Sequence, residues 1–449
     1  MIIEYLIVTL YRSRYKYTTL FLYRKRYFKK NAKKTTKIKC QDINDNYYYI
    51  CKESITRYNM KDYALKEMRR IGEILFISIA VLSCLGTGCK APAIESSVVF
   101  AEGSDSCHYY RIPAMALDAN ENIIAVIDRR YESLADLGYR NTSIDISTRR
   151  SKDGGRTWGP QTFIARGDTS KVTGYGFGDA SLTLTKSGKI ICLMACGNGT
   201  KGFRRGLKET ALSTSEDGGI TWSELRIIPF PSHLHSAFVT SGKGIVDKDG
   251  DILLSACVLD RDYPDPMPVP WPIDAHLFYS KDEGETWTLQ EETAYKLADE
   301  SKLVELGDGR LLISSRRWFY SPRGFNTATK GDDGIYHWDE QRVAETLVVN
   351  PCNGDIVSWK DGVLLHTYIK AEKERKGLTM AVSQDEGVTW NDIITLQDSF
   401  AAYSTMVVFK NGDVGVLYED GSNSPDDGYD IVFSRVPRRL IKQSIKAVQ

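Results

Sequence analysis

The pattern of apolar and polar residues changes near Ser96, where short apolar runs begin to alternate with polar turns. One such run, Ile123 to Ile127, follows a polar turn at 118–122. Comparable runs follow turns that contain Gly, at 186–188, 247–250, 307–309 and 410–412. Short apolar runs bounded by turn residues are typical of β-strands. The pattern predicts an all-β protein, and it indicates no long helix.

A second turn signal, S-x-D-x-G-x-T-W, occurs four times. The copies are SKDGGRTW (151–158), SEDGGITW (215–222), SKDEGETW (280–287) and SQDEGVTW (383–390). Short Ser and Asp side chains can accept hydrogen bonds from turn amides, Gly permits positive φ, and Trp covers the turn with buried area. Each copy therefore predicts a hairpin turn between two strands.

The spacing of these turns predicts the architecture. Trp338 ends a degraded copy, GDDGIYHW, and the tryptophans at 158, 222, 287, 338 and 390 are separated by 64, 65, 51 and 52 residues. A repeat of about 40–50 residues is typical of four-stranded propeller blades, and longer intervals leave room for loops. Five blades are marked in this way, and strands within 96–148 and 400–436 would complete a sixth. Four chance turns in an all-β protein would not be expected to match at such regular intervals. We predict a six-bladed β-propeller.

The chain divides into three predicted segments, 1–67, 68–89 and 90–449. Residues 1–67 are rich in Lys and Arg and show no repeat. They are interpreted as an upstream extension that is not part of the mature protein, with a basic interaction arm as the alternative.

Residues 68–89 have the features of a secretory signal. Two arginines follow Met68, and the apolar run Ile74 to Leu82 is too short to span a bilayer. Cys84, after Val81-Leu82-Ser83, or Cys89 would serve as a lipidation site. We expect an exported protein of the periplasm or cell surface that is lipid-anchored, with plain secretion as the second choice. Membrane contact is expected only through this anchor.

The charge balance and the cysteine spacing give no sign of nucleic-acid binding or of a metal site. With 59 basic and 58 acidic residues, the chain has no global charge that would favour nucleic acid as a partner. Five cysteines lie in the predicted domain, at 107, 192, 196, 257 and 352, without the spacing of a metal site. We expect buried thiols, no metal and no cofactor, and we assign no histidine a role.

The candidate chemistry comes from residues outside the repeats. They are Arg111 in Tyr110-Arg-Ile-Pro113, Arg130 in Asp128-Arg-Arg-Tyr131, Asp136, Glu300 in Asp299-Glu-Ser301, Arg316, Arg375, Tyr403 in Ala401-Ala-Tyr-Ser-Thr-Met406 and Glu419 in Leu417-Tyr-Glu419.

This combination resembles the bacterial exo-α-sialidases, or neuraminidases. The shared features are the R-I-P start, the repeated Asp boxes, a Glu and an Arg sixteen residues apart, and the late A-Y-S-T-M strand, over about residues 96–436. The resemblance implies a six-bladed propeller that acts on sialylated glycans. It also implies a role for each candidate residue: Asp136 as acid/base, Tyr403 as nucleophile, Glu300 as its supporting carboxylate, Arg111, Arg316 and Arg375 as a clamp on the substrate carboxylate, Arg130 as a further pocket arginine, and Glu419 as the partner of Arg111.

The implied roles agree with the chemistry of sialic acid. Planar guanidinium groups pair with a carboxylate in bidentate fashion, and each buried cation needs a compensating charge. The substrate carboxylate would repel an Asp or Glu nucleophile, whereas a neutral phenol avoids that repulsion. A carboxylate within hydrogen-bond reach can take the phenol proton during attack.

Two other functions are compatible with the sequence. A trans-sialidase or intramolecular trans-sialidase would use the same residues, with a glycosyl acceptor in place of water. A propeller that binds glycans without cleaving them could carry the Asp boxes and the arginines, but it would not need Tyr403, Glu300 and Asp136 together. The sequence leaves linkage preference and oligomeric state open.

Overall fold

The computed structural model describes residues 93–137, 144–168, 175–197, 206–263, 271–317, 322–421 and 428–449. These ranges belong to one structural unit, Lys90–Gln449. The predicted leader 1–67 and the signal segment 68–89 lie outside the described residues. Export and lipid anchoring at Cys84 or Cys89 therefore stay predictions.

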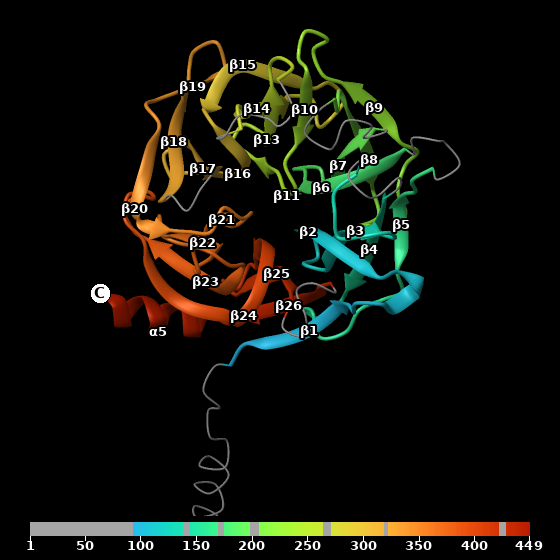
Figure 1. Cartoon of the computed structure of the whole chain (residues 1–449). Helices are drawn as coiled ribbons and strands as arrows, with labels where there is room; N and C mark the ends of the chain where they lie inside the picture. The colour runs from blue at the N-terminus through green and yellow to red at the C-terminus, as the bar shows by residue number, and fades with distance from the viewer. Residues whose placement is uncertain are drawn as a thin grey trace, which may run out of the picture. The chain divides into compact units, whose positions relative to one another are not determined.

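Five hydrogen-bonded sheets are arranged in a ring (Figure 1). The first contains β2 (Tyr109–Leu117), β3 (Ile123–Arg130), β4 (Ile144–Ser151) and β5 (Thr162–Ala165). The second contains β6 (Gly176–Leu184), β7 (Ile190–Gly197), β8 (Glu209–Ser215), β9 (Arg226–Pro229) and β11 (Gly242–Lys243). The third contains β10 (Ser236–Val239), β12 (Ile245–Val246), β13 (Ile252–Leu259), β14 (Asp274–Ser280) and β15 (Thr288–Tyr295). The fourth contains β16 (Ala298–Glu305), β17 (Leu311–Arg317), β18 (Pro322–Lys330), β19 (Tyr336–Trp338) and β20 (Arg342–Val348).

The fifth sheet has seven strands. In spatial order they are β1 (Glu95–Phe100), β26 (Asp430–Val436), β25 (Val414–Asp420), β24 (Asn391–Val408), β23 (Lys376–Ser383), β22 (Leu364–Ile369) and β21 (Asp355–Ser358). Strand β24 pairs with β23 as far as Phe400 and with β25 from Ala401 onward. The propeller fold is confirmed, but the sheets number five rather than the six predicted blades, because one continuous strand joins two predicted blades.

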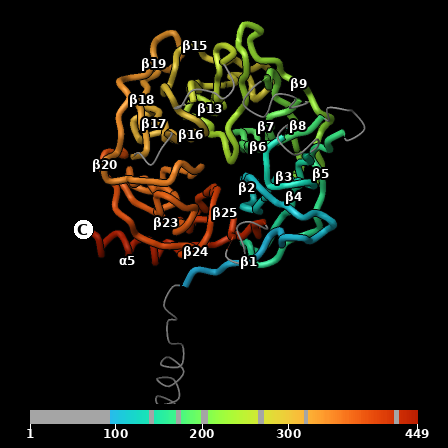
Figure 2. The backbone as a smooth tube through the Cα atoms, viewed as in Figure 1, coloured from blue at the N-terminus to red at the C-terminus, as the bar shows by residue number. Residues whose placement is uncertain are grey.

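The ring is closed by its two ends. The N-terminal β1 pairs antiparallel with β26, the last strand of the chain. Figure 2 shows the blue β1 beside the red C-terminal segment. The sequence analysis expected strands outside the first and last repeated turns to complete the ring. The pairing of β1 with β26 does this.

The four S-x-D-x-G-x-T-W turns share one hydrogen-bond network. In the first, the Ser151 hydroxyl accepts from the Gly155 amide at 2.9 Å, and Asp153 accepts from the amide and hydroxyl of Thr157 at 3.0 and 2.6 Å. The same bonds form at 215–221, 280–286 and 383–389. Gly155 has φ of 92°, which confirms the predicted need for glycine. Trp338 lies in β19, outside such a network.

The described residues include one α-helix that the sequence interpretation did not anticipate, α5 (Arg438–Val448). Ile441 and Ile445 lie one helical turn apart and are buried against a core cluster that includes residues of β24 and β25. A short 3₁₀ turn, η3 (Ser104–Ser106), precedes β2. Within the described ranges no helix has both the length and the apolar character needed to cross a membrane.

Four strands nearest the propeller axis are interrupted by irregular pairing. Register shifts lie between Arg111 and Ala114 in β2 and between Gly178 and Ser181 in β6. Others lie between 298 and 301 in β16 and between 401 and 404 in β24. An extra residue of this kind bends a strand and redirects a side chain. The shifts in β2, β16 and β24 coincide with predicted functional residues.

Candidate active site

Tyr403 forms the centre of the site. The residue is 5% exposed, and its hydroxyl donates a short hydrogen bond to Glu300 Oε1. Arg316 Nη1 donates to the other oxygen of Glu300, Oε2, and to the Tyr403 hydroxyl oxygen at 3.0 Å. Glu300 and Arg316 come from neighbouring antiparallel strands, β16 and β17, which explains how residues sixteen apart converge. The arrangement pairs a phenol with a carboxylate able to accept its proton.

The phenol of Tyr403 is neutral in this environment. Burial and the adjacent Glu300 carboxylate raise its pKa well above the ordinary value of 10.0. Arg316 and Arg375 oppose this shift without overcoming it. A phenol of this kind can act as a nucleophile only if its proton moves to Glu300 as attack proceeds.

Three arginines surround the Tyr403 ring. Besides Arg316, the guanidinium carbons of Arg111 and Arg375 lie 5.4 and 5.5 Å from the ring centroid. Arg111 and Arg316 each form an ion pair with a buried carboxylate, Glu419 and Glu300 respectively. Arg375 has no ion pair or hydrogen bond with the described residues. Arg375 is therefore the arginine of this group whose charge an anionic ligand would compensate.

Glu419 links Arg111 to Tyr403. Its Oε1 accepts from Arg111 Nε at 2.6 Å and from the Ile112 amide at 2.8 Å. Its Oε2 accepts from the Tyr403 amide at 3.0 Å. Ile112 has φ of 57°, an uncommon value for a β-branched residue, within the irregular part of β2. The Glu419 ion pair keeps the pKa of Arg111 well above its ordinary value, although burial alone would lower it.

Arg130 and Asp136 form the other side of the site. Arg130 Nη1 lies 3.0 Å from Asp136 Oδ1, and Arg130 Nη2 lies 2.8 Å from Asp128 Oδ2. Both Arg130 and Arg111 donate to the carbonyl oxygen of Leu134, which links the two halves. The Asp136 side chain is 29% exposed, whereas Asp128 is fully buried. Asp136 is therefore the carboxylate that a ligand can reach.

The structure thus brings all eight predicted site residues to one end of the strands around the axis. Sequence reasoning left three further residues without a role: Asp128, Asp179 and Tyr429. Burial raises the pKa of Asp128 to about 6 despite its pairing with Arg130. Burial, together with the carboxylates of Asp128 and Glu300, raises the pKa of Asp179 well above its ordinary value. The sequence contained a signal for Asp128. It lies two residues before Arg130 on the same strand, and side chains two residues apart on a strand point to the same face.

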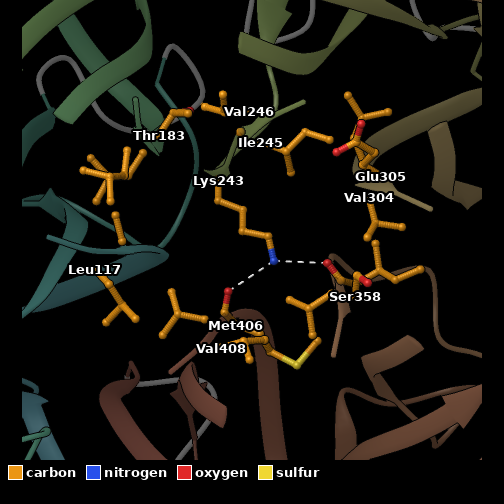
Figure 3. A pocket seen from close by; sticks show the side chains of 18 of the residues that line it. Leu117, Thr183, Lys243, Ile245, Val246, Val304, Glu305, Ser358, Met406 and Val408 are labelled. Atoms are coloured by element: carbon orange, nitrogen blue, oxygen red, sulfur yellow. Dashed lines mark hydrogen bonds between the residues drawn. The ribbon is translucent and has the colours of Figure 1, made fainter. Parts of the chain in front are cut away.

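The described residues contain no group of side chains suited to hold a metal. The five cysteines of this domain are free and buried, as expected. A cavity of about 570 Å³ lies elsewhere on the axis (Figure 3). Its lining includes Val407 and Val408, four and five residues beyond Tyr403, which corresponds to about 13–17 Å along a strand. This cavity is therefore distinct from the Tyr403 site.

Comparisons with known proteins agree with this arrangement. A family model described as a BNR repeat-like domain matches residues 131–416. A sialidase of Micromonospora viridifaciens is 30% identical over 354 residues, covering 74% of this chain and 53% of that protein. A sialidase of Clostridium perfringens is 26% identical over 354 residues, covering 70% of this chain and 87% of that protein. Among solved structures, the Hadza microbial sialidase Hz136 aligns with a TM-score of 0.66 at 25% identity, covering 77% of this chain and 68% of that one. The chain thus spans about half the length of the Micromonospora relative.

Proposed function

We propose that this chain, which belongs to the BNR repeat-like domain family and is similar to known sialidases, is an exo-α-sialidase. It would hydrolyse terminal sialic acids from glycoproteins, glycolipids or oligosaccharides. The observation that carries the proposal is the Tyr403 hydroxyl, hydrogen-bonded to Glu300 and surrounded by three arginines.

The arginines supply the proposed binding mode. Sialic acid carries a carboxylate on its anomeric carbon, and Arg111, Arg316 and Arg375 would hold that group directly beside the Tyr403 oxygen. Two of these cations are already held by Glu419 and Glu300, so their positions are fixed before substrate arrives. Preorganised charge of this kind lowers the reorganisation needed at the moment of reaction.

In the first chemical step, the Tyr403 oxygen attacks the anomeric carbon as its proton passes to Glu300. The bond to the glycosidic oxygen breaks, and Asp136 gives its proton to that oxygen. The result is a covalent glycosyl-enzyme and a free aglycone.

In the second step, water attacks the same carbon while Asp136 takes one of its protons. The bond to the Tyr403 oxygen breaks, and Glu300 returns the proton to the phenol. Two displacements restore the original face, so the first product has the α configuration.

The proposal is tested by identifying the product formed from sialyllactose, with proton NMR used to follow the first-formed anomer. Free α-sialic acid is the expected product. Transfer of the sugar to an added glycan would indicate a trans-sialidase, and an anhydro sugar would indicate the intramolecular reaction. Tight binding without turnover would indicate a glycan-binding propeller.

The export of this protein is a separate proposal that rests on the sequence alone. We expect lipid attachment at Cys84 or Cys89 after cleavage of the preceding segment. Metabolic labelling with palmitate, in the parent and in Cys84→Ser and Cys89→Ser variants, would identify the modified residue. Equal labelling of both variants and the parent would contradict anchoring at either one alone.

A further inference from the structure

Arg111 lies close to two tyrosine rings. Its guanidinium carbon is 5.4 Å from the centroid of Tyr403 and 5.3 Å from that of Tyr429. Tyr429 immediately precedes β26 and is 7% exposed. A guanidinium over an aromatic face is attracted to the ring, and the attraction strengthens when water is excluded. Tyr429 thus restrains Arg111 in addition to the ring of Tyr403.

The remaining contacts of Arg111 leave part of its guanidinium open. Its hydrogen bonds to described residues use Nε, toward Glu419, and Nη1, toward the Leu134 carbonyl. The second terminal nitrogen has no partner among those residues. Two ring contacts and two hydrogen bonds therefore fix the group while leaving one end for a ligand.

The hydroxyl of Tyr429 differs from those of other buried tyrosines. Tyr110, Tyr336 and Tyr368 donate to Ser104 O, Asp247 Oδ2 and Asp392 Oδ1 at 2.8, 2.9 and 2.5 Å. The Tyr429 hydroxyl has no hydrogen-bond partner among the described residues. Its oxygen is also absent from their completely buried, unpaired atoms, so it keeps some access to solvent. A largely buried phenol usually finds a partner, so this one is open to a ligand.

The charges around Tyr429 indicate which ligand group would reach it. Burial, followed by the nearby Glu419 carboxylate, raises the pKa of Tyr429, so the phenol keeps its proton near neutral pH. The positive charges of Arg111 and Arg375 oppose this rise in pKa without cancelling it. A donor hydroxyl beside two clamp arginines would face the same anionic group that they bind.

We propose that Tyr429 is a substrate-binding residue whose ring holds Arg111 and whose hydroxyl donates a hydrogen bond to the sialic acid carboxylate. This inference rests on the proposed function, because it assigns a further contact to the same site. Asp or Glu at this position would repel the carboxylate, whereas a neutral phenol donates without adding charge.

Two substitutions separate the contributions of the ring and the hydroxyl. Tyr429→Phe keeps the ring and removes the hydroxyl, so KM should rise about fivefold with kcat within about twofold of the parent, as for loss of uniform binding. Tyr429→Leu also removes the ring, and a further rise of about fivefold in KM is expected. Tyr418→Phe is the matched control, because Tyr418 is a buried tyrosine of the adjacent strand whose hydroxyl lies 3.5 Å from Ser434.

A third variant acts on the Tyr429 ring without removing any group. A Cβ on Gly421 would lie 3.1 Å from Tyr429 Cε1, closer than ordinary packing allows. Gly421→Ala should therefore raise KM through displacement of the ring. If this variant, Tyr429→Phe and Tyr429→Leu all leave KM within 1.5-fold of the parent, a tolerance of roughly 0.2 kcal/mol, Tyr429 has no part in binding.

A binding measurement keeps the inference independent of turnover. Calorimetry would compare the 2,3-unsaturated sialic acid analogue with its C1 amide, which lacks the negative charge. We expect Tyr429→Phe to weaken the acid about fivefold and the amide much less. Equal weakening of both would overturn the carboxylate contact, and failure of the parent to bind the acid would overturn it as well. Binding of the acid with the expected pattern but no turnover would instead contradict only the proposed function.

Discussion

The two ends of the strands around the axis contain buried charge of two different kinds. At the Tyr403 end, Arg375 has no counter-ion among the described residues. At the cavity end, the Lys243 ammonium donates to Asp355 Oδ2, Ile356 O and Met406 O at 2.7, 3.1 and 3.1 Å. Figure 3 shows Lys243 reaching toward Met406. A lysine ammonium has three donors, so this one is fully used. The charge of Lys243 is thus satisfied within the fold, whereas a bound anion would be needed to compensate the charge of Arg375.

The backbone shows the same contrast. Ile112 and Asp179, with φ of 57° and 52°, lie in the irregular segments of β2 and β6. Further along these strands, pairing with β3 and β7 is regular as far as Leu117 and Leu184. Uncommon backbone conformations in non-glycine residues persist only where surrounding contacts enforce them. Within β2 and β6, both residues lie in the irregular segment toward Tyr403 and not in the regularly paired segment toward the cavity.

The largest expected effect is at Tyr403, the proposed nucleophile. Tyr403→Phe removes one oxygen and keeps the ring between the arginines, so kcat should fall by about a thousandfold or more. The thermal midpoint should shift by only a few degrees, because the ring still fills its place. Steady-state kinetics and calorimetry check both. A variant with more than about a tenth of parental activity would show that another group attacks the substrate.

A smaller loss is expected in the clamp. Arg316→Lys keeps a positive charge but loses the planar fork that contacts Glu300 and Tyr403, so kcat/KM should fall about a hundredfold with little change in thermal midpoint. Activity within about threefold of the parent would mean that Arg316 does not grip the substrate.

The opposite result is expected at the cavity end. Lys243→Met leaves the buried Asp355 carboxylate without its ammonium partner, so the protein should be destabilised by about 3 kcal/mol. The activity of the folded fraction should stay within about twofold of the parent, because the change is remote from Tyr403. Loss of activity without loss of stability would contradict the separation of the two ends.

The smallest predicted effect depends on pH. Burial lowers the pKa of Lys302 to about 8, although Asp355 and Glu300 oppose this shift. Below pH 8 the folded state holds a charge that it disfavours. Between about pH 8 and the lysine pKa of about 10.4 in the unfolded chain, folding releases a proton from Lys302. The stability of the parent protein therefore rises with pH in this range. Lys302→Met should therefore gain its largest increase in thermal midpoint at pH 7, and the gain should shrink from pH 8 to 10. A constant difference across this range would show that the lysine pKa is not lowered by folding.

The repeated turns could be predicted from the sequence because each turn is formed by residues that are close together in the chain. In the first turn, the hydrogen bonds of Ser151 with Gly155 and of Asp153 with Thr157 all form within seven residues. The spacing of these residues is therefore enough to predict the turn. The roles of Glu300 and Arg316 were implied by the resemblance to the sialidases, and the pairing of β16 with β17 explains why residues sixteen apart converge. The continuity of β24 through Phe400 and Ala401 could not be predicted in this way, since it depends on pairing partners on both sides.

Tyr429 had no sequence signal of its own. It meets Arg111 only because the first and last parts of the chain close the ring, and no local period relates positions so far apart. Helix α5 did have a signal, the four-residue spacing of Ile441 and Ile445, but one pair is weak evidence in a β-rich chain.

The most direct test of the central claim is to trap the sugar on the protein. A 3-fluoro sialosyl fluoride should accumulate the covalent intermediate, because the ring fluorine slows both steps while the fluoride leaving group restores the first. Peptide mapping by mass spectrometry should then place the sugar on Tyr403, and the Tyr403→Phe variant should remain unlabelled. A label on another residue of the parent protein, or a first-formed product of β configuration, would contradict the account.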